Sequence, residues 1–127
     1  MTTQNLDRLC AQYGYQIADD VQKAIGKGAE NHITKSLGVL QENGIYAFFL
    51  YQASRSSEKD GAEKLREQAH KLLKAAGIKP FDTVSDSLEA VRTQGGLADK
   101  LDDLLLAKQL LEQALIYARY HAKVLGD

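Results

Sequence analysis

The chain has little of what cross-links a protein or interrupts its helices. Its 127 residues include one cysteine, one proline and no tryptophan. Cys10 alone cannot form an internal disulfide, and a single cysteine fits a reducing, cytoplasmic setting. Because the only proline is Pro80 and runs of β-branched residues are few, the composition predicts an all-α protein.

Long apolar runs are also missing. The stretch 45–51 is among the longest, and it is far too short to span a bilayer. Residues 1–5 carry no basic group, and the hydrophobic segment of a signal peptide does not follow them. These absences predict a cytoplasmic protein without a membrane segment.

Charge of one sign is not in excess, because the formal net charge is −1. The molecule as a whole therefore has no electrostatic reason to bind nucleic acid on its own. Hydrophobic residues make up 44% of the chain and charged residues 26%, as in ordinary globular proteins. A chain of 127 residues is most simply one domain, residues 1–127.

Apolar residues recur at three- and four-residue spacing along most of the chain, which is typical of helices. The expected helices are residues 2 or 3 to 26, 30–42, 45–54, 57–76, 84–93 and 97–125, with a loop at 77–83 around the proline. Thr2 or Thr3 would cap the first helix, and Ser57 with Asp60 approximates a capping box for the fourth. The predicted fold is a single compact all-α bundle of about five to six helices.

The last of these helices, 97–125, contains neither Gly nor Pro, and the other elements should pack around it. Acids open it and bases close it, which complements the helix dipole, and it would be about 43 Å long. One face holds Leu97, Leu101, Leu104, Leu111, Leu115 and Ala122, and the other side holds Leu106, Leu110, Tyr117 and Val124. A helix that is apolar on two sides needs two sets of neighbours, in its own bundle or in another chain. The aromatic third helix, with Phe48 and Phe49, is expected to fill the core beside it.

No catalytic or metal-binding constellation stands out. His70 follows Glu67 at the spacing used in di-iron bundles, but one such pair opposite an apolar stripe favours a solvated charged face. Asp99, Asp102 and Asp103 are explained by their place in the first turns of a helix. Cys10 lies on an apolar stripe and is expected to be a small core residue. We therefore expect no enzyme activity, no cofactor and no metal.

Charges are segregated along the chain. Residues 82–103 hold six acids and two bases, whereas residues 108–123 hold three bases and one acid. A normally solvated surface is one interpretation; head-to-tail stacking of copies, or a basic flank that faces a phosphate backbone, are others. Lys108 falls within the main apolar face of the last helix, where a purely solvated surface would not place it.

Two segments resemble the Cmr-type small helical subunit of type III CRISPR effector complexes. Residues 33–50 read ITKSLGVLQENGIYAFFL, a helix with a basic residue that ends at Asn-Gly before an apolar helix. Residues 104–125 form a Leu- and Ala-rich helix with late aromatic and basic residues. The sequence departs from the family where Ser36-Leu37-Gly38 replaces a common proline and where the late aromatic is Tyr instead of Trp.

The resemblance implies a non-catalytic subunit whose copies stack into a filament beside the backbone subunits of the complex. Basic surfaces would stabilise the duplex of guide RNA and target RNA, so the implied partners are other subunits, both RNAs and copies of itself. Lys35, Arg119 and Lys123 match basic positions of the family, and charge placement alone adds three more. The candidate RNA-binding residues are Lys27, Lys35, Arg55, Lys108, Arg119 and Lys123. The alternative is a helical adaptor that dimerises through its C-terminal helix without binding nucleic acid.

Overall fold

A computed structural model describes residues 5–93 and 95–126 as a bundle of helices joined by short connections. The α-helices are α1 (Leu6–Ile25), α2 (Ala29–Asn43), α3 (Ile45–Ser54), α4 (Lys59–Ala75), α5 (Lys79–Thr83), α6 (Ser87–Arg92) and α7 (Leu101–Gly126). Two 3₁₀ turns, η1 (Gly26–Gly28) and η2 (Leu97–Asp99), precede α2 and α7. The predicted all-α fold with a long C-terminal helix is confirmed.

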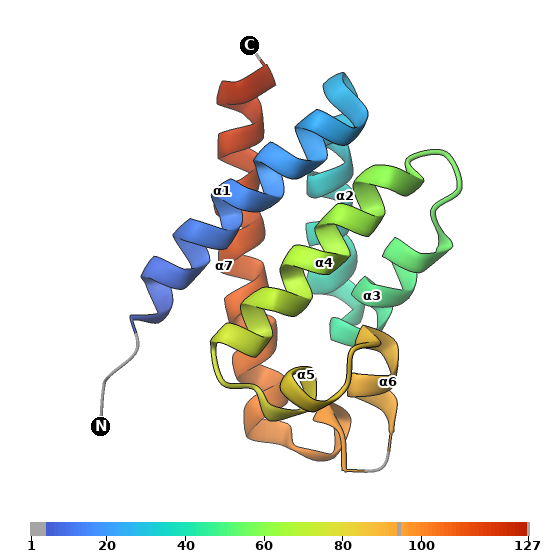
Figure 1. Cartoon of the computed structure of the whole chain (residues 1–127), viewed down its shortest axis with the longest axis vertical. Helices are drawn as coiled ribbons and strands as arrows, with labels where there is room; N and C mark the ends of the chain where they lie inside the picture. The colour runs from blue at the N-terminus through green and yellow to red at the C-terminus, as the bar shows by residue number, and fades with distance from the viewer. Residues whose placement is uncertain (1–4, 94, 127) are drawn as a thin grey trace.

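The helices form two layers (Figure 1). α1 and α4 lie side by side in the front layer and run in opposite directions, while α7 and α2 run behind them and cross them. α7 packs mainly on α1 and α2, so it has neighbours on two sides. α5 and α6 close the lower end of the bundle in this view. No helix within 5–93 and 95–126 has the length and apolarity needed to cross a membrane.

α1 and α7 approach each other closely because small residues line their contact. The buried positions of α7 are Ala107, Leu110, Leu111, Ala114, Leu115, Ala118 and Ala122. Gly14 of α1 is buried against this surface, where a β-carbon would lie 2.7 Å from the Tyr117 Cβ and 2.8 Å from the Ala114 carbonyl oxygen. Gly14 therefore marks a tight helix crossing, which only a residue without a side chain permits.

The ends of two helices differ from the predicted ones. α1 is capped by Asn5, whose side chain accepts a hydrogen bond from the Arg8 N–H, while the proposed caps Thr2 and Thr3 lie outside the described residues. α4 begins at Lys59 without a side-chain cap, so the capping box at Ser57 is wrong. The Ser57 hydroxyl instead accepts a hydrogen bond from Arg55, at 3.3 Å.

The loop predicted at 77–83 contains a short helix, α5. Proline is compatible with the first turn of a helix, where its missing N–H needs no partner, and Pro80 occupies such a position. Ile78 and Phe81 on either side are 2% and 1% exposed, so they anchor this segment in the core. α6 begins later than predicted, at Ser87, because the Asp86 side chain caps the Leu88 and Glu89 N–H groups.

The apolar faces assigned to the last helix are partly wrong. Leu97 is fully buried but belongs to η2, and α7 begins only at Leu101 because Lys100 is extended. Leu101 and Val124 are 66% and 74% exposed. Lys108 lies at the edge of the buried face and not within it, with its ammonium 3.9 Å from Glu112.

α3 lies elsewhere than expected. It packs on α2, α4 and α6 and only marginally on α7. Phe48 and Phe49 are fully buried as predicted. The other buried residues of α3 are Ile45 and Gln52, whereas Ala53 is exposed. The aromatic helix therefore fills the core on the side away from α1.

Candidate nucleic-acid interface

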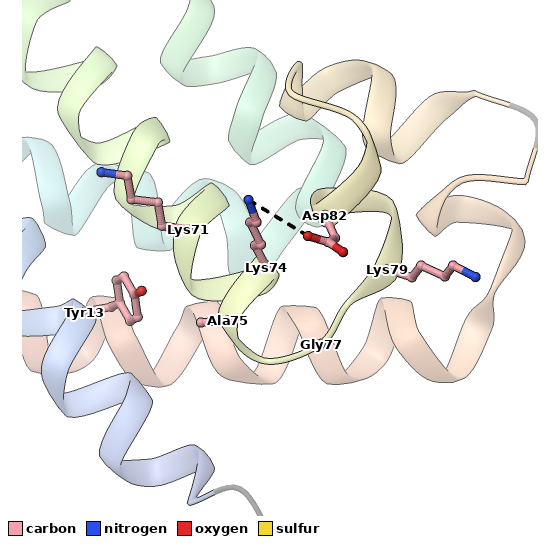
Figure 2. Close-up of a pocket in the computed structure, with 7 residues that line it drawn as sticks. All are labelled: Tyr13, Lys71, Lys74, Ala75, Gly77, Lys79 and Asp82. Atoms are coloured by element: carbon pink, nitrogen blue, oxygen red, sulfur yellow. Dashed lines mark ion pairs between the residues drawn. The ribbon is translucent and has the colours of Figure 1, made fainter.

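A hollow of the described surface lies between the end of α4, α5 and Tyr13 of α1 (Figure 2). Its volume is about 640 Å³, and Lys71, Lys74 and Lys79 supply three ammonium groups around it. Lys74 turns toward Asp82, with 3.9 Å between its Nζ and a carboxylate oxygen, whereas Lys79 extends away from the other two lysines. We call this hollow, together with a second hollow lined by Gln12, Gln16 and Gln68, the α1–α4 groove.

Side-chain amides extend the groove along the two front helices. Tyr13 and Lys71 also line a second hollow of about 350 Å³, together with Gln12, Gln16 and Gln68. The Gln16 and Gln68 amides each donate a hydrogen bond to Asp20, at 2.9 Å, so that carboxylate orients both. Lysine ammonium groups, amides and an aromatic ring together suit the phosphates, sugars and bases of a nucleic acid.

The lysines of this groove were missed in the sequence, although a signal was present. Residues 68–81 contain three lysines and no acid, but the outer face of this helix was taken as ordinary solvated charge. Tyr13 gave no signal, because it lies about sixty residues from Lys71 in the chain and only the packing of α1 on α4 brings the two together. A groove between two helices that lie side by side does not show in linear charge patterns.

Three of the six predicted basic residues lie near one end of the molecule. Lys27 and Lys123 line a hollow of about 160 Å³ together with Glu30, where η1 meets the end of α7. Arg119 lies one helical turn before Lys123, and its guanidinium sits 5.4 Å from the centre of the Tyr120 ring. We call Lys27, Arg119 and Lys123 the α7 basic end.

The other three predicted residues lie apart from this end. Lys35 is exposed on α2. Lys108 lies on α7 eleven residues before Arg119 and forms an ion pair with Glu112. Arg55 lies between α3 and α4, where it contacts Glu58 at 3.5 Å and covers the Tyr51 ring at 5.2 Å. Their assignment to RNA stays a prediction, and Lys108 and Arg55 already have partners within the chain.

A buried hydrogen-bond network joins α2 to α3. The Gln52 amide donates to the Ser36 hydroxyl, which in turn donates to the His32 carbonyl, both at 2.8 Å. This leaves the Gln52 carbonyl to accept from His32 Nε2–H at 2.9 Å, so the ring proton is on Nε2. His32 is fully buried, and burial lowers its pKa more than the hydrogen bond from its ring to Gln52 and the nearby Glu58 raise it.

The sequence suggested that His70 lies on a solvated charged face, and this prediction is wrong. Its Nε2–H donates to the Phe81 carbonyl at 2.9 Å, and its Nδ1 lies 2.8 Å from the Ser87 hydroxyl, which can donate to it. The ring thus ties α4 to α5 and α6, and burial lowers its pKa. Glu67, its proposed metal-binding partner, points to Lys64 instead, at 3.9 Å.

Both histidine shifts predict acid-sensitive stability. A histidine whose pKa is lowered in the folded state is neutral there, so stability is full above its ordinary value of 6.5 and falls as the pH drops below it. Urea unfolding from about pH 7.5 to about pH 5.5 should therefore give a falling free energy of unfolding. His70→Gln should make this dependence shallower. Equal slopes for variant and parent would contradict the assignment of His70.

Other candidate sites behave as structural residues. Cys10 is 2% exposed, its thiol donates to the Leu110 carbonyl at 3.4 Å, and burial raises its pKa to about 11. Asp99 accepts a hydrogen bond from the Gly95 N–H at 2.6 Å and so stabilises the turn before η2. Among the described residues, no group of three or more His, Cys, Asp or Glu side chains is placed to hold a metal ion.

Comparison with known proteins adds no assignment. The chain matches no family model, and searches of curated proteins and of solved structures gave no match either. The functional argument therefore depends on the residues and the geometry above.

Proposed function

We propose that the chain is a non-catalytic small subunit of a type III CRISPR ribonucleoprotein effector complex. In this role copies stack into a filament beside the backbone subunits and stabilise the duplex of guide RNA and target RNA through basic surfaces, in antiviral defence. The proposal combines the sequence resemblance of residues 33–50 and 104–125 with the two basic surfaces described above.

The α1–α4 groove is the observation that carries the RNA contact. Lys71 and Lys74 face it from one helix, Tyr13 faces it from another, and Asp82 is the one acid among the residues that line its larger part. A phosphate backbone that follows the groove would meet the ammonium groups, then the amides of Gln16 and Gln68. The net charge of −1 makes tight binding by the isolated chain unexpected, so the groove would act where neighbouring subunits already hold the RNA.

Charge reversal in the groove tests the proposal. We expect Lys71→Glu with Lys74→Glu to weaken target-RNA retention by the assembled complex and to lower its salt dependence. Loss of two phosphate contacts should reduce the slope of log affinity against log salt by about 1.5 to 2. The measurement is RNA binding by complexes reconstituted with each variant, at several salt concentrations.

The matched control is Lys59→Glu with Lys64→Glu. These lysines are exposed on the same helix but outside the groove, and their reversal changes the net charge equally. Reversal of the α7 basic end (Lys27, Arg119 and Lys123 to Glu) gives a second arm. If the groove variant retains RNA as well as the control does, the groove assignment is wrong; if all three do, the RNA role fails.

A second candidate function is favoured by a different observation. Large apolar side chains are exposed on α7: Leu101, Leu105, Tyr120 and Val124. They suit a helical adaptor that pairs through its C-terminal helix and contacts no nucleic acid. Purification from native cells separates the two functions, because RNA and CRISPR backbone subunits co-purify in the first and protein partners alone in the second.

A further inference from the structure

The side of α7 that faces away from the bundle carries exposed apolar residues toward both of its ends, with polar residues between them. Leu101, Leu105, Tyr120 and Val124 are 66%, 52%, 60% and 74% exposed, and Ile116 is half-buried beside them. Four-residue steps connect 101, 105 and 109 and again 116, 120 and 124, so the residues follow a ridge that winds gradually across the outer side of the helix. We call Leu101, Leu105, Gln109, Ile116, Tyr120 and Val124 the α7 outer face. Single exposed apolar residues are normal, but several on the outer side of one helix are typical of an interface.

The spacing of the α7 outer face is the same from either end. Leu101 lies as far before the midpoint between residues 112 and 113 as Val124 lies after it. Leu105 and Tyr120 are related in the same way, and so are Gln109 and Ile116. A two-fold axis at this midpoint would therefore place each apolar residue of one copy at the level of an apolar or amide residue of a second, antiparallel copy. Interfaces of this kind, in which one patch meets itself, are usual in homodimers.

Charge complementarity selects the antiparallel arrangement. Asp102 and Lys123 are also equally distant from the midpoint, both are exposed, and neither forms an ion pair within the described chain. Antiparallel helices bring Asp102 of each copy to the level of Lys123 of the other, whereas parallel helices would bring equal charges together. Near the axis the two Glu112 carboxylates approach each other, but each is accompanied by Lys108 of its own chain at 3.9 Å.

We propose that the α7 outer face is the contact surface of a two-fold homodimer with antiparallel α7 helices. The dimer face shares no residue with the α1–α4 groove, so the inference does not depend on RNA binding there. Lys123 also belongs to the α7 basic end, so in the dimer its ammonium group would face Asp102 of the other copy instead of RNA. A two-fold contact closes at two copies, so a longer stack of subunits would need a second surface of the molecule. A single helix pair is a small interface, and we expect dimerisation in the micromolar range.

Cysteine cross-linking of the purified full chain tests the arrangement. Leu105→Cys and Tyr120→Cys are both at exposed positions, and buried Cys10 can stay because its raised pKa leaves little reactive thiolate. In an antiparallel dimer either variant alone places its two cysteines about 22 Å apart, and only the mixture of the two cross-links efficiently. The proposal would be overturned if each variant cross-linked efficiently with itself. It would also be overturned if neither the mixture nor the single variants cross-linked.

Charge reversal gives an independent measurement, by sedimentation across micromolar to millimolar concentrations. Asp102→Lys should raise the dimer Kd about tenfold, since two symmetric exposed pairs are lost. Adding Lys123→Asp should restore the parent Kd, and circular dichroism checks that each variant is folded. A parent chain that stays monomeric throughout, or a double variant as weak as the single, would contradict the pairing.

Discussion

Replacement of Phe49 by alanine is expected to lower the free energy of unfolding by about 3–5 kcal/mol. The ring is fully buried and stands at the centre of an aromatic chain. Its centroid lies 5.0 Å from that of Phe48 and 5.8 Å from that of Phe81, whose ring in turn contacts His70 at 5.0 Å. Because the whole domain is stable by only about 5–15 kcal/mol, this single loss could leave it marginally folded.

The control for this substitution is Tyr46→Ala on the same helix. Tyr46 is 37% exposed, so its removal leaves no enclosed cavity and should cost far less than the loss of Phe49. Urea unfolding followed by circular dichroism measures both. Equal destabilisation would mean that the α3 helix as a whole, and not the cavity at position 49, determines the result.

A methyl group at position 14 is expected to destabilise the protein by about 1–3 kcal/mol. In most helices Gly→Ala is favourable by about 1 kcal/mol, so the expected sign is opposite to the usual one. The new carbon of Gly14→Ala would lie 2.8 Å from the Ala114 carbonyl oxygen and 2.7 Å from the Tyr117 Cβ. Neither atom is the end of a flexible side chain, so α1 and α7 would have to move apart.

Gly38→Ala is the matched comparison. Gly38 lies inside α2, and a β-carbon there meets no atom within 4 Å. We expect this variant to be more stable than the parent by about 0.5–1 kcal/mol. Thermal or urea unfolding of both variants gives the comparison. If position 14 also tolerated alanine with a gain, the two helices would not be held as closely as the structure has them.

Helix positions could be predicted well where the chain marks them locally. The helix predicted at residues 45–54 has the same bounds in the structure. Asn43-Gly44 marks the end of the preceding helix, because Gly44, at φ 92°, occupies a conformation that favours glycine. The prediction of a loop around Pro80 was wrong. Buried side chains on both sides of the proline stabilise a helical turn that propensity alone does not predict. Tertiary burial, which local patterns do not contain, determined that segment.

Which side of a helix faces the core was harder to predict. Leu101 looked like a core residue by its spacing, yet it is 66% exposed because the chain enters α7 only after η2 has buried Leu97. Charge lists had the same limit at the candidate site. The distribution of charge along the sequence indicated Lys27 and Lys123, which the fold brings together. It could not show that Tyr13 and Lys71 lie beside each other. Contacts between residues far apart in sequence depend on how helices cross.

The close crossing of α1 and α7 also has a consequence for synthesis. α1 is made about 75 residues before α7, so α1 and α2 have no permanent cover for their α7-facing sides until α7 has left the ribosome. Cys10 and Leu110, in contact in the finished molecule, are 100 residues apart in the chain. Such distant contacts form slowly compared with local ones. This part of the nascent chain should therefore remain open, and accessible to chaperones or proteases, until α7 has been made and has packed on α1 and α2.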